Sequence, residues 1–159
     1  MRERTPFELA ALPFKKYATF SGRAPRAEYW WFYLATSIIS ALLSGVDKVA
    51  GDTGAASGLF SLAILTPWLA VTVRRLHDTD RSGWWLAILC AGLVLLGIFA
   101  VWAANAASSG VKAIWFIPLF GLVVAFITLF IFMVLPGTDG GNSYGPDPYG
   151  PDNLEEIFA

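Results

Sequence analysis

The sequence is poor in charged residues and has a single cysteine, and each of these shortages excludes a class of protein. Only 14% of the 159 residues are charged and 56% are hydrophobic, whereas roughly a quarter of the residues in an ordinary soluble domain are charged. The lone Cys90 excludes an intrachain disulfide framework and a four-cysteine zinc site. A chain of single-domain length with so little charge is therefore not expected to be a soluble globular protein.

Long uncharged runs take the place of a soluble pattern. A helix rises about 1.5 Å per residue, so about 20 apolar residues cross a hydrocarbon core of about 30 Å. The runs of about that length without a charged residue are 29–46, 55–73, 84–104 and 113–135. The sequence therefore predicts an all-α integral membrane protein, built as a four-helix bundle over residues 29–135.

Pro67 lies inside the second of these runs. Proline cannot donate the backbone hydrogen bond of a regular helix, but a membrane helix tolerates it where another group satisfies the freed carbonyl. Thr66 stands next to the proline. We therefore expect a kinked spanning helix in which a Ser/Thr side chain or another neighbour supplies that hydrogen bond.

The basic residues are unevenly distributed over the predicted loops, which favours one orientation. On the predicted inner side are Arg2, Arg4, Lys15, Lys16, Arg23, Arg26, Arg74, Arg75 and Arg81, and on the outer side are Lys48 and Lys112. Lysine and arginine are enriched in cytoplasmic loops. Both termini are therefore predicted to be cytoplasmic.

The N-terminal 28 residues are predicted to form a cytoplasmic interfacial segment. Thr5-Pro6-Phe7-Glu8 has the pattern of a capping box with proline in the first helical position. A short interfacial helix is expected to follow and to end near Pro13. Its aromatic side chains would then lie in the headgroup region, with Lys15 and Lys16 towards anionic lipid. The alternative is a solvated tail.

With this topology, three unusual polar segments fall on the cytoplasmic side. They are "GRAPRAEYWWF" before and within the first run, "RRLHDTDRSGWW" between the second and third, and "GTDGGNSYGPDP" in a Gly/Pro-rich acidic tail over 136–159. By these motifs and their order, residues 14 to 148 resemble the family called domain of unknown function 805, small bacterial inner-membrane proteins. The resemblance implies a multi-pass inner-membrane location, but no activity and no catalytic residues.

The residue types in these segments are suited to pairing with one another, because arginine forks bind carboxylates bidentately. The candidate cluster is Arg23, Arg26, Glu28, Arg74, Arg75, His77, Asp78, Asp80, Arg81, Asn142, Tyr144 and Asp147. We expect Asp78 or Asp80 to hold an arginine, and Asn142 and Tyr144 to brace the tail against the loop. One interpretation is that the cluster only clamps the loops, and the other is that its arginines and the nearby tryptophans bind anionic lipid headgroups or a protein partner. The two are compatible if some of the arginines are left unpaired.

Two other functions are compatible with the sequence. An enzyme acting on a phosphate-bearing lipid would use the loop with His77, Asp78 and Asp80, although residues so close in sequence rarely form a catalytic relay and the flanking arginines compete with a metal for the carboxylates. A small transporter or channel usually needs ionisable residues along its pathway, and no predicted helix carries a charge. Four helices per chain could still form a pore as a homo-oligomer. No catalytic residue, metal, cofactor or nucleic-acid partner is predicted.

Overall fold

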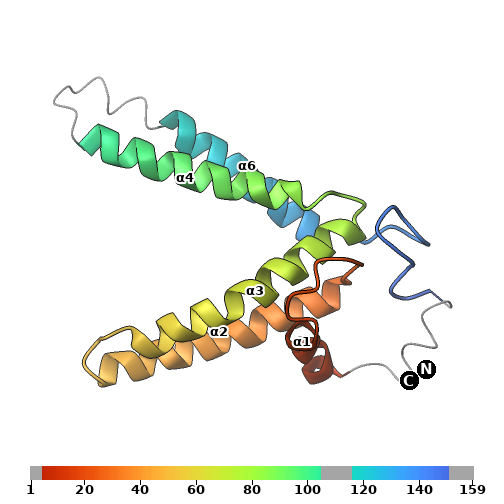
Figure 1. Ribbon diagram of the computed structural model, residues 1–159, viewed down its shortest axis with the longest axis horizontal. Helices are drawn as coiled ribbons and strands as arrows, with labels where there is room; N and C mark the ends of the chain where they lie inside the picture. Colours follow the sequence, from red (N-terminus) through yellow and green to blue (C-terminus); the bar gives the residue numbers. More distant parts are fainter. Residues whose placement is uncertain (1–4, 105–115, 151–159) are drawn as a thin grey trace.

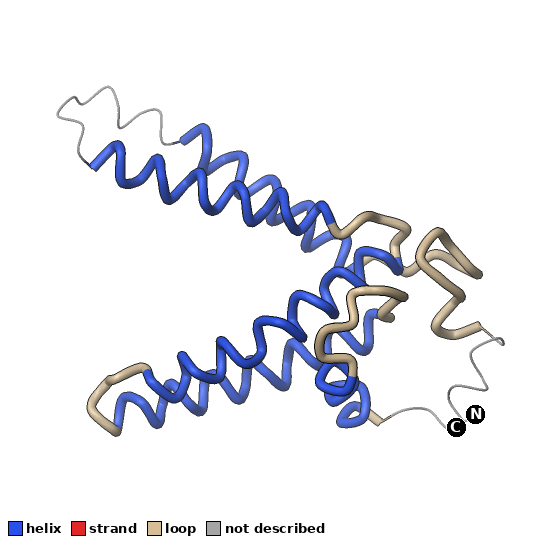
Figure 2. The backbone as a smooth tube through the Cα atoms, viewed as in Figure 1, coloured by secondary structure: helices blue, strands red, loops and turns tan. Residues whose placement is uncertain are grey.

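The computed structural model describes residues 5–104 and 116–150, and the regular elements in these ranges are α-helices. They are α1 (Pro6–Lys15), α2 (Arg26–Val49), α3 (Ala55–Asp78), α4 (Trp84–Ala104) and α6 (Phe116–Val134) (Figures 1 and 2). The predicted all-α class is thus confirmed. The predicted start of the last apolar run, at residues 113–115, lies outside the described residues.

The helices continue past the limits of the apolar runs. α2 begins at Arg26 after Pro25, and α3 continues to Asp78 instead of ending at residue 73. Arginine and leucine are good helix formers, so the helix does not end where its charged residues begin. α3 ends at Asp78, just before Asp80 takes a left-handed φ of 55°. There the Arg81 N–H donates back to the Leu76 carbonyl at 2.9 Å.

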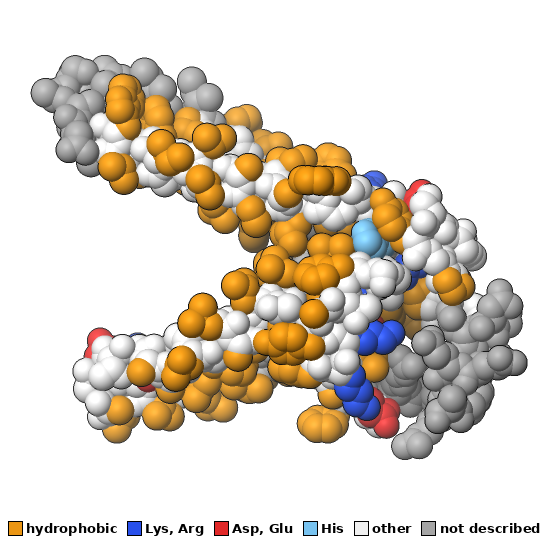
Figure 3. Space-filling view, viewed as in Figure 1, with side chains coloured by type: hydrophobic (Ala, Val, Ile, Leu, Met, Phe, Trp, Pro, Cys, Tyr) orange, Lys and Arg blue, Asp and Glu red, His pale blue; other side chains and the backbone are white. Residues whose placement is uncertain are grey.

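Within residues 5–104 and 116–150, three helices are long and apolar enough to cross a membrane. These are α2, α3 and the Trp84–Trp102 part of α4, while Pro118–Val134 in α6 is apolar over a shorter stretch. Large hydrophobic side chains along them are exposed, for example Leu42 and Leu59, and Figure 3 shows such side chains along both arms of the molecule. An outward apolar surface of this kind suits lipid as the surrounding solvent.

The helices form two antiparallel hairpins, α2–α3 and α4–α6, that meet at one end and diverge towards the other (Figure 1). We call the end where they meet the joined end. Here the start of α2, the end of α3, the start of α4 and the end of α6 come together. Bundle-type packing of the four helices is therefore restricted to this end of the described structure. Apolar contacts between helices can be replaced by lipid contacts at little cost, so apolar composition alone does not require closure along the whole length.

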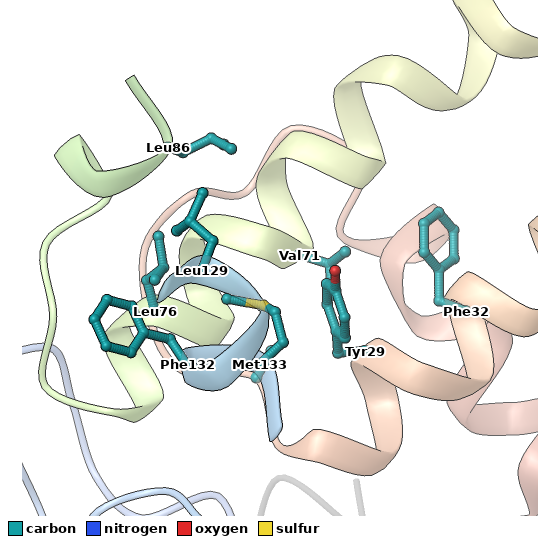
Figure 4. Packing of buried hydrophobic residues seen from close by; sticks show 9 residues of the cluster. Tyr29, Phe32, Val71, Leu76, Leu86, Leu129, Phe132 and Met133 are labelled. Carbon is teal, nitrogen blue, oxygen red and sulfur yellow. The ribbon is translucent and has the colours of Figure 1, made fainter. Parts of the chain in front are cut away.

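The buried hydrophobic cluster lies at the joined end. Its members are Ala24, Tyr29, Phe32, Val71, Leu76, Leu86, Leu129, Phe132 and Met133. Figure 4 shows the side chains from α3, α4 and α6 close to one another, with Tyr29 beside Val71. The core thus lies directly beneath the polar segments that the sequence singles out.

The predicted capping box of α1 is confirmed. The Thr5 N–H donates to the Glu8 carboxylate at 2.8 Å, and the Glu8 N–H donates to the Thr5 hydroxyl at 3.3 Å. The helix does not end at Pro13 but includes it and runs to Lys15. Pro13 is buried, and the Phe14 ring meets the Phe32 ring edge-on at 5.3 Å, so α1 packs against the first hairpin.

Candidate functional site

Asp78, the last residue of α3, is the centre of the polar contacts at the joined end. One carboxylate oxygen accepts a hydrogen bond from Arg23 Nε at 2.9 Å, and the other accepts from Arg75 Nη1. All three side chains are buried. The Asp78 backbone carbonyl accepts from the Thr138 N–H at 2.9 Å. Asp78 therefore connects the segment before α2 with α3 and the segment after α6.

Arg23 uses its remaining nitrogens to hold that last segment. Its Nη1 donates to the Gly140 carbonyl and its Nη2 to the Thr138 carbonyl, each at 2.6 Å. A guanidinium has donors in a fixed planar fork, and all three nitrogens of Arg23 have partners. The side chain is thus satisfied by the protein itself.

Arg75 does the same for the end of α6. Its Nε donates to the Met133 carbonyl at 3.3 Å and its Nη2 donates to the Leu135 carbonyl. The last carbonyls of a helix have no partner within the helix, and cations are favourable near a helix C-terminus. Arg75 therefore joins the C-terminal end of α6 to α3 and Asp78.

Arg74, its neighbour in sequence, belongs to a separate pair. Its Nη1 donates to Glu28 in the first turn of α2 at 2.7 Å, and both side chains are buried. The Ala24 N–H donates to the Arg74 carbonyl at 3.0 Å. Unlike Arg75, Arg74 leaves its Nε and Nη2 without a hydrogen-bond partner. The pair fixes α2 against α3 within the first hairpin.

His77 and the tail form a second layer of contacts. The rings of His77 and Tyr144 are stacked, with centroids 3.9 Å apart and planes 6° apart. The Asn142 side-chain amide donates to the His77 carbonyl at 2.8 Å and to the Thr138 hydroxyl at 2.9 Å. Asp80 accepts from the Ser143 N–H at 3.3 Å. These contacts brace the tail against the loop after α3.

The other residues of the predicted cluster lie at its edge. Arg26 is exposed, and its Nη1 is 3.5 Å from the Val134 carbonyl. The Arg81 guanidinium lies over the Phe132 ring at 4.1 Å. The Asp147 carboxylate accepts from the Tyr149 N–H at 2.9 Å and the Gly140 N–H at 3.1 Å, and the bond from Tyr149 lowers the pKa of this carboxyl.

Gly137 opens the "GTDGGNSYGPDP" segment and is a member of the site that the predicted cluster did not include. A Cβ atom at this position would overlap with an Asp78 carboxylate oxygen. Only glycine lets the backbone of the tail pass so close to Asp78. The signal in the sequence was the glycine that directly follows Pro136, where the chain leaves α6.

The arrangement is chemically a closed network of charges. The carboxylate of Asp78 is occupied by two arginines, and the His77 Nδ1 lies 3.2 Å from the Gly22 carbonyl. Within the part of the chain that the structure describes, no group of three or more His, Cys, Asp or Glu side chains could hold a metal ion. The contacts of Asp78 hold together the segment before α2, the end of α3 and the segment after α6.

Comparison with known proteins agrees with a membrane location. The model of the family described as "Protein of unknown function (DUF805)" matches residues 17–146. The chain is 33% identical to the inner membrane protein YhaH of Escherichia coli strain K12, over 84% of this chain and 90% of that protein. It is 36% identical to the inner membrane protein YhaI of the same strain, over 84% of this chain and 89% of that protein. No solved structure matches. With this match over residues 17–146 and these two relatives, the chain belongs to the DUF805 family of proteins of unknown function.

Proposed function

We propose that this protein crosses the bacterial inner membrane four times, with both termini in the cytoplasm, and acts there as a scaffold that binds anionic lipid headgroups. The apolar helices and the inner-membrane relatives support the location. The excess of basic residues on the side of the joined end supports the orientation. On this reading the joined end faces the cytoplasm.

The observation that carries the lipid proposal is the division of the basic residues into two groups. Arg23, Arg74 and Arg75 are buried and pair within the protein. Lys15, Lys16 and Arg26 are exposed. The buried arginines thus hold the loops together, and the exposed Lys15, Lys16 and Arg26 are the group that is accessible to a ligand.

Aromatic side chains accompany the exposed cations. Phe14, Tyr17 and Phe20 are between 43% and 44% exposed, and they flank the lysines in sequence. Figure 3 shows basic side chains beside hydrophobic ones at the joined end. An interfacial segment with apolar side chains in the bilayer and lysines above them binds anionic membranes both by hydrophobic burial and by electrostatic attraction. We call Lys15, Lys16 and Arg26 the basic rim.

The test is lipid retention by the purified full chain. The triple variant Lys15→Gln, Lys16→Gln, Arg26→Gln should retain phosphatidylglycerol about tenfold to a hundredfold less well than the parent protein from mixed micelles with phosphatidylcholine, at low salt. The matched control is Lys48→Gln, which removes an exposed lysine at the opposite end of α2. Equal phosphatidylglycerol retention by the triple variant and the control would overturn the lipid proposal.

The orientation has its own test. A reporter that is active only in the cytoplasm, fused after Ala159, should be active, and one that is active only outside the inner membrane should not. The opposite pattern would reject the proposed topology, whatever the lipid result.

A further inference from the structure

Pro67 interrupts the backbone hydrogen bonds of α3 at one point. It lies inside the helix and is buried. In a regular helix the N–H of residue 67 would donate to the carbonyl four residues earlier, which belongs to Ala63. Proline has no N–H, so this carbonyl loses its usual donor.

A residue from the N-terminal segment takes the place of that donor. The hydroxyl of Tyr17 donates to the Ala63 carbonyl. Thr66, which the sequence made the nearest candidate, is not the residue that reaches it. The replacement thus comes from 46 positions away in the chain, and it could not be identified from the residues around Pro67.

The same segment is anchored on the other helix of the hairpin. Pro13 in α1 is buried and Phe14 packs edge-on against Phe32 of α2. Contacts from residues 13 to 17 therefore reach both α2 and α3. Tyr17 is the member of this set that supplies a polar bond where the helix itself lacks one.

We propose that the Tyr17–Ala63 hydrogen bond is a latch that fastens α1 to the first hairpin at the proline of α3. The latch makes Tyr17 a positioning residue, and it couples the placement of α1 to the hydrogen bonding of α3. This coupling is stronger where lipid excludes water, because a backbone carbonyl without a hydrogen-bond donor is costly in lipid. When α1 moves away, the Ala63 carbonyl loses its partner and α3 loosens around Pro67. This inference does not depend on lipid binding by the basic rim.

A double-mutant cycle tests the latch in the full chain reconstituted in lipid nanodiscs. Tyr17→Phe removes the donor, and Pro67→Ala restores an N–H that can serve Ala63 within the helix. Amide hydrogen exchange of α1 should become about threefold to tenfold faster in Tyr17→Phe, the range expected for loss of one hydrogen bond. In the Pro67→Ala background the same change should have less than about half that effect on a logarithmic scale.

Tyr33→Phe is the matched control, since Tyr33 is exposed on α2 and contacts Trp30 through its ring. It should leave exchange in α1 unchanged. An equal effect of Tyr17→Phe in both backgrounds, or no effect in the parent protein, would overturn the latch.

A measurement on the parent protein covers the case in which Pro67→Ala does not fold. With tyrosine labelled at Cζ, the hydroxyl proton of Tyr17 should exchange with water more slowly than that of Tyr149, which is exposed in the segment after α6. Exchange of Tyr17 as fast as that of Tyr149 would also reject the latch.

Discussion

The two ends of the first hairpin are held together in different ways. At the joined end, buried ion pairs at Asp78 and Glu28 lie over a hydrophobic core. At the opposite end, one carboxylate caps the next helix: Asp47 of α2 accepts from the N–H groups of Ala56 and Ser57 at 3.0 and 2.9 Å. The contacts at the joined end connect segments far apart in the chain. Those of Asp47 span only the loop between α2 and α3.

The difference shows what determines the arrangement of apolar helices. Their hydrophobic surfaces give little preference between another helix and lipid. Polar groups do give a preference, because a buried charge without its partner is strongly destabilising. The hairpins therefore meet where the charged residues are, and they diverge where the described side chains are mainly apolar.

The largest expected effect comes from removing the charge at the centre of the joined end. Asp78→Asn keeps the shape of the side chain but leaves Arg23 and Arg75 buried without a carboxylate, which should cost about 3–5 kcal/mol. Thermal unfolding of the purified protein measures the loss. The control is Asp80→Asn, which affects an exposed residue with one hydrogen bond from a backbone N–H. Equal losses in the two variants would show that Asp78 is not the centre.

The next effect separates two neighbouring arginines. Arg75→Lys cannot reproduce three hydrogen bonds made by a planar fork and should lower the free energy of unfolding by about 2–4 kcal/mol. Arg74→Lys keeps a cation for the single hydrogen bond to Glu28 and should cost less than about 1.5 kcal/mol. Denaturant titration compares the two. A larger loss for Arg74→Lys would contradict the assignment of their partners.

A smaller effect is expected from space rather than charge. Gly137→Ala places a methyl group against the Asp78 carboxylate, and the forced shift should cost about 1–3 kcal/mol. Gly141→Ala is the matched control, because its nearest neighbour would be the Gly145 carbonyl oxygen at 3.8 Å. Thermal unfolding should distinguish the two alanine variants, and identical midpoints would mean that the tail does not pass against Asp78.

The smallest effect is expected at the opposite end. Asp47→Ala removes the acceptor for two amides in the first turn of α3, so those amides should exchange faster with solvent. Exchange in the last turn of α3, at the joined end, should stay as it is. Faster exchange throughout α3 would show that the two ends are not independent.

Local features of this structure could be predicted because each depends on a few adjacent residues. The uncharged runs indicated the helices, and Thr5 with Glu8 indicated the capping box. The presence of arginines and carboxylates on one side indicated pairing there. In the structure it is Asp78, one of the two expected candidates, that holds arginines, and Asn142 and Tyr144 contact the loop after α3.

The choice of partners could not be predicted in the same way. Adjacent residues on a helix point in directions about 100° apart, so Arg74 and Arg75 reach different carboxylates, and the sequence does not say which. The passage of Gly137 against Asp78 and the bond from Tyr17 to Ala63 depend on where distant segments lie. The divergence of the hairpins depends on contacts that lipid can replace.

The hydrogen bonds of Arg23 have a consequence for the order in which the protein can be completed during synthesis. Arg23 and Asp78 both leave the ribosome before α4, but the carbonyls of Thr138 and Gly140 that satisfy the same guanidinium leave it only after α6. A nascent chain that stops after α6 has every described apolar helix and still lacks these acceptors. The hydrogen bonds of the Arg23 guanidinium are therefore completed only after all the described helices have been made.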